Sequence, residues 1–262
     1  MSAADYFAAD GVNWSTLKAM RDSPKAYRYA CDNPRADTLP FMLGRAVHTA
    51  VLTPAWFDAE FVEWDGGDRR GKEWAAFKEA HAGKTILKAD EMALVNDIAS
   101  AVLADPVAAA LIADGDAEQP IFWRDPGTGL MCKARADIVD KSRLLLLDLK
   151  TTKSIDPRRF GNECARLGYH LQMAHYAAGC LHGLGWAPQA HILVAVEKDQ
   201  PHDVGVFEIP PANRELAAEE VASLLERVRE CREANRWPGR FESVQLLQLP
   251  AYIEGELEFS YE

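Results

Sequence analysis

The chain has 262 residues, of which 48% are hydrophobic and seven are tryptophan, enough for one large domain or two small ones with a substantial core. Its formal net charge of −11 argues against nonspecific coating of DNA, because nucleic-acid-binding domains are usually basic, although a channel lined by Lys and Arg can be positive inside an acidic exterior. No apolar run approaches about 18 residues, the N-terminus lacks an export signal, and the five cysteines are scattered, so we expect no membrane partner and a reducing, cytoplasmic location.

The first part of the chain, to about residue 115, is predicted to be a helical lead-in. Asn13 is a good capping residue for a first short helix, which Ser23-Pro24 breaks. The strongest helix is expected over Phe41–Leu52, where Gly44, His48 and Leu52 share one face. Three more helices are expected, over residues 73–82, 88–103 and 106–112. The polar segment 65–72 carries three basic residues and is predicted to be a surface loop that could touch a phosphate backbone.

A sheet is predicted to follow. It begins with Glu118–Trp123 and continues, after a hairpin turn at 125–129, with Met131–Val139. Strand period two places Lys133, Arg135 and Asp137 on one face of that second strand. A polar turn then leads to the apolar run Leu144–Leu147, which is typical of a strand buried on both faces.

The second half alternates helices and strands, which indicates an α/β (α+β) chain. We expect one long helix from about Pro157 to His182, then a strand over 189–197 with an antiparallel neighbour over 202–209, and a last long helix over 212–235. The acidic and aromatic tail, 240–262, is predicted to pack as an extended strap. The histidines His170, His175 and His191 have no ligand spacing that we recognise and are predicted to be structural.

Charged residues end the buried strand, in the sequence Asp148-Leu149-Lys150. Asp148 and Lys150 share a face, and buried charges need partners. With Asp137 on the preceding strand, two carboxylates and one ammonium can converge, and a hard divalent cation is the partner that suits two carboxylates best. The Leu149 carbonyl is a possible further ligand. Lys150 could orient or deprotonate a water or offset charge on a phosphate.

Other residues would extend such a site. Lys133 and Arg135, on the face of Asp137, suit phosphate binding, and Glu118 could reach the same metal cluster. Each signal is weak alone: an Asp-x-Lys sequence is often a strand-end ion pair, and an isolated histidine such as His48 is more often a hydrogen-bonded residue of a packed helix. Together with Asp137, they are compatible with a metal site, and the structural alternative stays open beside it.

Five sequence segments occur in an order that resembles the PD-(D/E)XK nucleases, and more closely the RecE-type (exonuclease VIII) branch carried by phages and prophages. The segments are Gly44-Arg-Ala-Val-His48, Glu118, Cys132-Lys-Ala-Arg-Ala-Asp137, Leu147-Asp148-Leu-Lys150-Thr-Thr and Gln172-Met-Ala-His-Tyr176. Ala136 departs from the pattern, since it stands where the family name has Pro. The likeness runs from the Ser15-Thr-Leu-Lys lead-in to about Tyr176.

The resemblance implies a restriction-endonuclease-like core, with a central mixed β-sheet flanked by helices. It also implies roles for individual residues: catalytic Lys150, Asp137, Asp148 and Glu118; metal ligands His48, Asp137 and Asp148; and DNA contacts that include Arg45, Thr151, Gln172 and Tyr176. The implied cofactor is one or two ions of Mg²⁺, or of Mn²⁺, which an imidazole suits better. Residues 1–262 would form one exonuclease domain, with a lead-in to about 115 and a nuclease core at about 116–236.

The activity implied is 5′→3′ digestion of linear double-stranded DNA, which leaves 3′ single strands for recombination by annealing. Such enzymes form toroidal oligomers, here a tetramer or trimer, work with a single-strand annealing protein, and act in the cytoplasm of a bacterial host. Two alternatives stay open: a different PD-(D/E)XK nuclease, such as an endonuclease, and a non-catalytic module that binds DNA ends. The iron–sulfur nucleases of CRISPR adaptation need a four-cysteine cluster, and the cysteine spacing here does not provide one.

Overall fold

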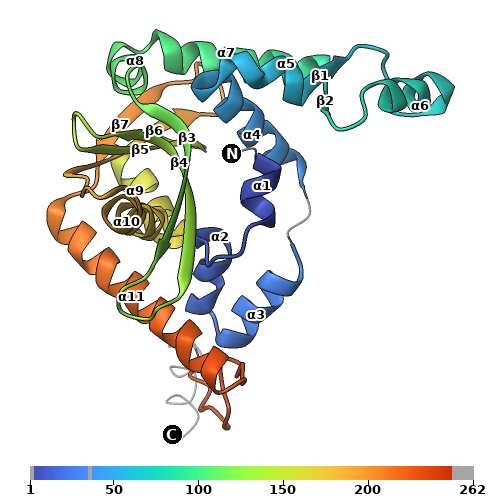
Figure 1. The fold of residues 1–262 in the computed structure, drawn as a ribbon. Helices are drawn as coiled ribbons and strands as arrows, with labels where there is room; N and C mark the ends of the chain where they lie inside the picture. Colours follow the sequence, from blue (N-terminus) through green and yellow to red (C-terminus); the bar gives the residue numbers. More distant parts are fainter. Residues whose placement is uncertain (1–2, 35–36, 250–262) are drawn as a thin grey trace, which may run out of the picture.

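A five-stranded mixed sheet forms the centre of the computed structural model, which describes residues 3–34 and 37–249 (Figure 1). The strands are β3 (Asp116–Arg124), β4 (Met131–Asp140), β5 (Leu145–Thr152), β6 (Ala190–Glu197) and β7 (Val204–Glu208), and they neighbour one another in that order. Strands β5 and β6 are parallel, and the other neighbours are antiparallel. The predicted strands and the mixed sheet are therefore confirmed.

Local chemistry explains the turn that joins β4 to β5. The Asp140 carboxylate accepts hydrogen bonds from the backbone N–H groups of Ser142, at 2.8 Å, and Arg143, at 3.0 Å, which closes the turn. The leucines that follow are buried on both faces of the sheet: Leu146 belongs to the hydrophobic core on one side, and Leu147 and Leu149 to the core on the other. Burial on both faces accounts for the continuous apolar run.

Helices cover both faces of the sheet (Figure 1). One face packs against α2 (Trp14–Leu17), the 3₁₀ turn Lys18–Arg21, α3 (Pro24–Asp32), α9 (Pro157–Leu167), α10 (Tyr169–Gly179) and α11 (Pro211–Glu233). The other face packs against α4 (Leu39–Leu52), α7 (Ala89–Ala104) and α8 (Pro106–Ile112). The helical lead-in thus contributes to both cores. Asn13 caps α2 as predicted, since its side chain accepts the N–H of Thr16 at 3.0 Å.

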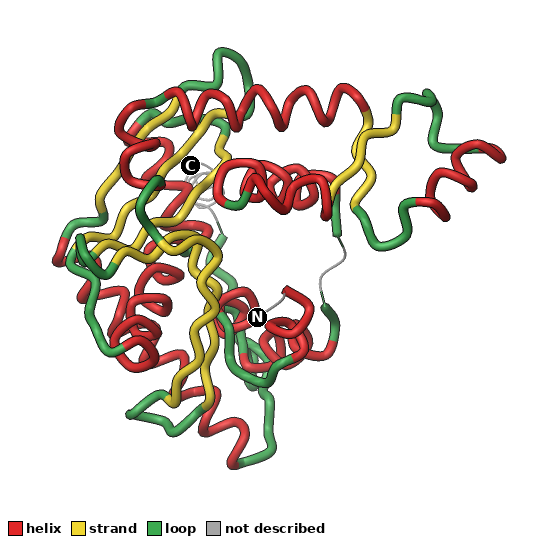
Figure 2. Tube along the Cα trace, turned by 45° about the horizontal axis from the view of Figure 1, so that its top comes forward, coloured by secondary structure: helices red, strands yellow, loops and turns green. Residues whose placement is uncertain are grey.

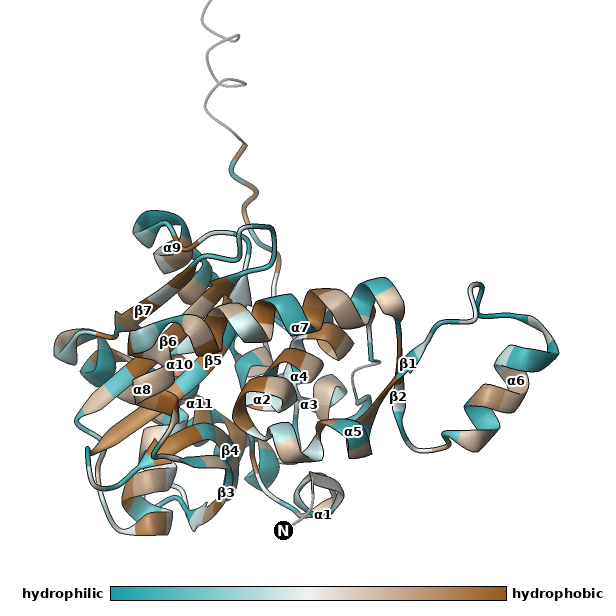
Figure 3. Cartoon of the chain, turned by 90° about the horizontal axis from the view of Figure 1, so that it is seen from above, coloured by the Kyte–Doolittle hydropathy of each residue, from teal (hydrophilic) through white to brown (hydrophobic). Residues whose placement is uncertain are grey.

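An arm projects from the body at residues 61–88 (Figures 1, 2 and 3). It follows the 3₁₀ turn Pro54–Trp56 and α5 (Phe57–Glu60), and consists of β1 (Phe61–Trp64), α6 (Gly71–Ala80) and β2 (Thr85–Lys88). Strands β1 and β2 pair in parallel as a separate two-stranded sheet, which the sequence analysis did not predict. Each of these strands has only four residues, and so short an alternation of apolar and polar residues cannot be recognised in a sequence.

The long helix predicted over 157–182 is wrong, because Gly168 divides it. Gly168 adopts φ +73°, the left-handed conformation that ends α9, and α10 begins at the next residue. Any side chain there would also meet the ring of Trp14, whose Cζ2 lies 2.9 Å from an added Cβ. After α10 the chain makes a π turn over Cys180–Leu184. The break turns α10 toward the sheet, where it carries Gln172 and Tyr176.

Two further expectations concern the ends and the membrane. Residues 240–249 form no helix or strand and are all exposed, so the packing expected of a strap is not found over this stretch; the rest of the predicted strap lies outside the described residues. Among the helices described, no single one is long and apolar enough to cross a membrane; α7 and α8 pass that test of length and composition only as a pair, and they meet at 89°.

Candidate active site

The site lies where two neighbouring strands separate. Strand β4 pairs with β5 only over three residues, from Ile138 opposite Leu147 to Asp140 opposite Leu145. Beyond this point β3 and β4 run away from the other strands (Figure 1). We call the point where β4 and β5 separate the fork. There the Asp137 side chain takes the place of a backbone hydrogen bond between the strands, because its Oδ2 accepts the buried N–H of Leu149 at 2.7 Å.

Three potential metal ligands meet at the fork, one each from α4, β3 and β4. One ligand atom of His48, one of Glu118 and one of Asp137 all lie within 4.8 Å of one another, and no other such group of three or more occurs among the described residues, which include all five cysteines. His48 Nδ1 is 3.3 Å from Asp137 Oδ2. We call these three residues the acidic cluster. It matches the predicted ligands His48 and Asp137 and brings Glu118 to them.

Glu118 holds its place by an unusual backbone conformation. Its neighbours in β3 pair with Ile138 and Ala136, so Glu118 stands opposite Asp137 and faces the same side of the sheet. Its φ of +51° interrupts the ladder at this residue. A non-glycine residue in this region is strained, and such strain is most often found at functional sites. The carboxylate also pairs with Arg135, whose Nε lies 2.6 Å from Oε2.

A second group of side chains lies beside the acidic cluster, on β5 and α10. Gln172 connects it: its Nε2 donates to Asp148 Oδ1 and to the Tyr176 hydroxyl, both at 2.9 Å, and its Oε1 accepts from Lys150 Nζ at 3.2 Å. Lys150 Nζ also contacts Asp148 Oδ2 and lies 4.6 Å from the centre of the Tyr169 ring. The predicted residues Asp148, Lys150, Gln172 and Tyr176 therefore form one hydrogen-bonded array.

Burial and crowding shift the pKa values of these groups in different directions. Burial raises the pKa of Asp148 to about 6 although Lys150 opposes it, and burial together with the Asp137 charge raises the pKa of Glu118 to about 7. Burial would also raise the pKa of Asp137, but His48, Lys150 and the Leu149 N–H together outweigh it and the pKa is lowered. Conversely, burial would lower the pKa values of His48 and Lys150, yet the facing carboxylates raise both.

The residues present fit a divalent cation. Two carboxylates and one imidazole converge, and burial together with the nearby Asp137 charge, which raises the pKa of Glu118, is a cost that a bound cation would offset. Asp148 stands just outside the three-ligand group, since Gln172 and Lys150 contact its oxygens. The N–H of Leu149 is taken by Asp137, and the role of its carbonyl as a ligand stays a prediction.

The predicted DNA contacts are placed less uniformly. Arg45, on α4 one turn from His48, pairs with Asp37 at 2.8 Å and reaches Thr85 of the arm at 3.0 Å. Arg135 lies beside the acidic cluster, and Thr151 is half-buried on β5 next to Lys150. Lys133 points elsewhere: it is 4% exposed, and its Nζ donates to backbone carbonyls near the N-terminus. The strand period of two predicts which face of β4 carries Lys133, but it does not predict that the N-terminal segment covers that face.

Sequence reasoning missed two contributors to the site. Tyr169 lies under the Lys150 ammonium, one helical turn before Gln172 on α10, but its position followed only from the unpredicted break at Gly168. The other is helix α1 (Ala3–Ala8), which packs on β4 beside Arg135. His175 is buried as predicted for a structural histidine, and its Nε2 donates to the Lys133 carbonyl at 3.2 Å.

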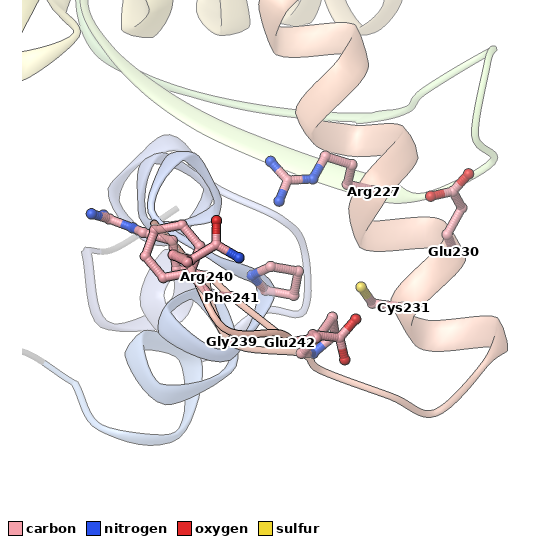
Figure 4. A pocket seen from close by; sticks show the side chains of 10 residues that line it. Arg227, Glu230, Cys231, Gly239, Arg240, Phe241 and Glu242 are labelled. Atoms are coloured by element: carbon pink, nitrogen blue, oxygen red, sulfur yellow. The ribbon is translucent and has the colours of Figure 1, made fainter. Parts of the chain in front are cut away.

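A cavity of about 410 Å³ lies apart from this site, between α3, the end of α11 and residues 238–245 (Figure 4). Its walls include Arg227, Glu230 and Cys231 of α11 and Arg240 and Phe241 of the following segment, and none of the predicted site residues. Arg240 is engaged in an ion pair with Asp22 at 2.6 Å. The acidic cluster is therefore the better candidate for chemistry.

Comparison with known proteins agrees with this geometry. The model of a family described as "PDDEXK-like domain of unknown function (DUF3799)" matches residues 13–250. No curated protein matches the chain. A crystal structure of a "Putative exonuclease" from Eubacterium rectale is similar over 100% of this chain and 99% of that chain, with a TM-score of 0.67 and 12% identity, which shows a shared fold. A phage-related exonuclease from Haemophilus somnus 129PT is more distant, with a TM-score of 0.39 and 11% identity over 88% of this chain and 99% of that chain.

Proposed function

The chain belongs to the DUF3799 family of PDDEXK-like domains, and from this premise we propose that it is a metal-dependent deoxyribonuclease that digests linear double-stranded DNA as an exonuclease. One observation carries the proposal. The acidic cluster of His48, Glu118 and Asp137 forms at the strand fork, directly beside the array that holds Lys150. Structural packing alone gives no reason to place three such groups within 4.8 Å of one another.

The metal in this proposal is one or two ions of Mg²⁺ or Mn²⁺. His48, Glu118 and Asp137 would hold it, with Asp148 as the neighbouring carboxylate. When bound, such an ion polarises a phosphoryl oxygen of the substrate and offsets its charge. An iron–sulfur site is disfavoured, because none of the five cysteines forms a ligand group.

The chain's own residues perform the remaining tasks. Lys150 has carboxylate and amide oxygens on its Nζ, an environment that suits an ammonium, so it supplies a fixed positive charge for the scissile phosphate. Gln172 holds both Asp148 and Lys150 by hydrogen bonds and therefore sets the position of that charge. Arg135, which pairs with Glu118 at the edge of the acidic cluster, would contact a neighbouring phosphate.

The finer features of the proposal rest on the resemblance to RecE-type enzymes. They are 5′→3′ polarity, release of 3′ single strands for annealing, a toroidal homo-oligomer, and a phage or prophage origin. The formal net charge of −11 supports a substrate that is held in a local channel and not on the general surface.

The test uses purified protein with linear duplexes labelled at either 5′ end, beside a circular duplex, in Mg²⁺, Mn²⁺ or EDTA. We expect the linear duplexes to be digested and the circular duplex to remain intact. We also expect short products to be released from only one of the two ends of each strand. Digestion of circular DNA would indicate an endonuclease, and binding of ends without digestion would indicate a non-catalytic module. Lys141→Ala, in the exposed turn between β4 and β5, is a suitable control for Lys150→Ala.

A further inference from the structure

Helix α1 forms one wall beside the acidic cluster, although it comes before residue 13, where the family match begins. Lys133 anchors it, because its buried Nζ donates to the carbonyls of Tyr6 at 3.0 Å, Phe7 at 3.3 Å and Ala9 at 2.6 Å. Three donated hydrogen bonds use the full capacity of an ammonium. The position of α1 relative to β4 is therefore well defined.

The two aromatic residues of α1 differ greatly in their exposure to solvent. Tyr6 is 6% exposed, and its ring lies 5.0 Å from Lys133 Nζ and 6.0 Å from the Arg135 guanidinium. Phe7 is 67% exposed, although its ring is held 5.5 Å from the same guanidinium and 5.4 Å from the Tyr6 ring. What distinguishes Phe7 from other exposed apolar residues is that Arg135 and Tyr6 hold its ring in place, so one face is fixed and open, and a flat group stacked on that face would remove it from water.

The surroundings of Phe7 indicate which ligand this is. Arg135 contacts the Phe7 ring and pairs with Glu118 of the acidic cluster, so one side chain separates the ring from the cluster. In a DNA strand, one sugar separates each phosphate from its base. A strand with its phosphate at the cluster would thus bring a flat base toward Phe7, and Arg135 would lie between the phosphate and the base. Every nucleobase has an apolar face that can stack on an aromatic ring without sequence preference.

We propose that Phe7 is a stacking surface for a nucleobase of the strand held at the acidic cluster. The inference rests on the proposed function, since it takes DNA as the substrate. The stack would hold an unpaired or terminal base outside the duplex and so fix the strand end at the fork. A second copy of this chain is the competing occupant of the exposed ring, and the experiment below distinguishes the two.

The experiment compares Phe7→Ala, Phe7→Leu and Phe7→Trp with the parent chain. Phe241→Ala is the matched control, because Phe241 has nearly the same exposure, 64%, and lies at the separate cavity of Figure 4. DNA binding is measured in a Lys150→Ala background, which prevents digestion, with 2-aminopurine placed singly at successive positions from each end. The KM and kcat for linear duplex are measured in the active chain.

We expect the 2-aminopurine emission at one end position to change on binding to the parent chain and to Phe7→Trp, because the base leaves the duplex stack, but not on binding to Phe7→Leu or Phe7→Ala. Loss of one stack weakens binding about 5-fold to 150-fold. KM should rise accordingly, kcat should change less, and Phe241→Ala should match the parent. The same emission change and the same KM in Phe7→Leu as in the parent would overturn the inference, and so would a change in sedimentation without a change in DNA affinity. If the parent chain digests no DNA, the proposed function fails, while the emission change on binding still decides the role of Phe7.

Discussion

Lys133→Met would test whether Lys133 anchors α1 or contacts DNA. Methionine keeps most of the apolar length of the side chain but removes the ammonium that reaches the carbonyls of Tyr6, Phe7 and Ala9. We expect α1 to open more often from β4, while the sheet stays folded, because elements with few buried contacts open independently of the global transition.

The size of the effect follows from the three hydrogen bonds. Hydrogen bonds to charged groups contribute about 1.5–3 kcal/mol each. Two effects make the net loss of stability smaller than the sum of these three bonds. Water reaches the freed carbonyls around exposed Phe7. The variant also avoids the cost of burying the ammonium, the burial that lowers the pKa of Lys133. A net loss of about 3 kcal/mol remains, which corresponds to an opening about 150 times more frequent.

Hydrogen exchange measures this opening directly. Two backbone bonds join the segment after α1 to β4, from Val12 N–H to the Met131 carbonyl and from Lys133 N–H to the Val12 carbonyl, both 2.9 Å long. Exchange of these two amides should accelerate about 150-fold in Lys133→Met and stay unchanged in Lys141→Met, where the lysine is exposed. Unchanged exchange, together with a DNA affinity that falls and depends less on salt, would refute the anchor and support the phosphate contact that the sequence suggested.

Three further predictions concern catalysis and pH. Asp148→Asn and Lys150→Ala should each lower the rate of DNA cleavage by at least about 1,000-fold, with circular dichroism unchanged; cleavage at the parent rate by either variant would remove that residue from the mechanism. Gln172→Ala should lower the rate less, about 10-fold to 100-fold, because it removes a supporting hydrogen-bond partner and leaves the acidic cluster intact. Burial lowers the pKa values of His175 and His191 to about 4, so the unfolded chain takes up protons first as pH falls below about 6.5, and stability falls between pH 6.5 and 4. By pH 5 each histidine should have cost about 2 kcal/mol, and urea titrations at pH 7 and pH 5 should show a decline smaller by that amount in His175→Gln; an equal decline would contradict a buried neutral histidine.

The sequence predicts the centre of the site well, because local periodicity determines it. Period two alone places Asp148 and Lys150 on one face, and the structure joins them in an ion pair. Glu118 was expected near the metal from its place at the start of the first strand of the sheet. The role of His48 as a ligand came only from the resemblance, because no spacing rule relates residue 48 to residue 137 and their meeting depends on packing between elements far apart in the chain.

The errors share a physical cause, since each involves a contact between distant segments. Lys133 was assigned to the correct face, but helix α1, more than a hundred residues earlier, covers that face. Gly168 resembled a tolerated glycine in a helix, which costs only about 1 kcal/mol, and the ring of Trp14 that requires a glycine there is far away in sequence. Strands β1 and β2 pair across twenty intervening residues, from 65 to 84.

The fork itself explains why these distant segments matter to the site. Because β4 pairs with β5 only over its last three residues, its backbone groups at residues 131–137 have no neighbouring strand on that side and need other partners. The segment at Val12 supplies partners for Met131 and Lys133, and His175 on α10 supplies one more for the Lys133 carbonyl. The same separation leaves Asp137 free to turn its carboxylate toward Leu149 and His48. The N-terminal segment and α10 thus complete the edge of β4, and without them the open fork that holds the acidic cluster would expose unpaired backbone groups.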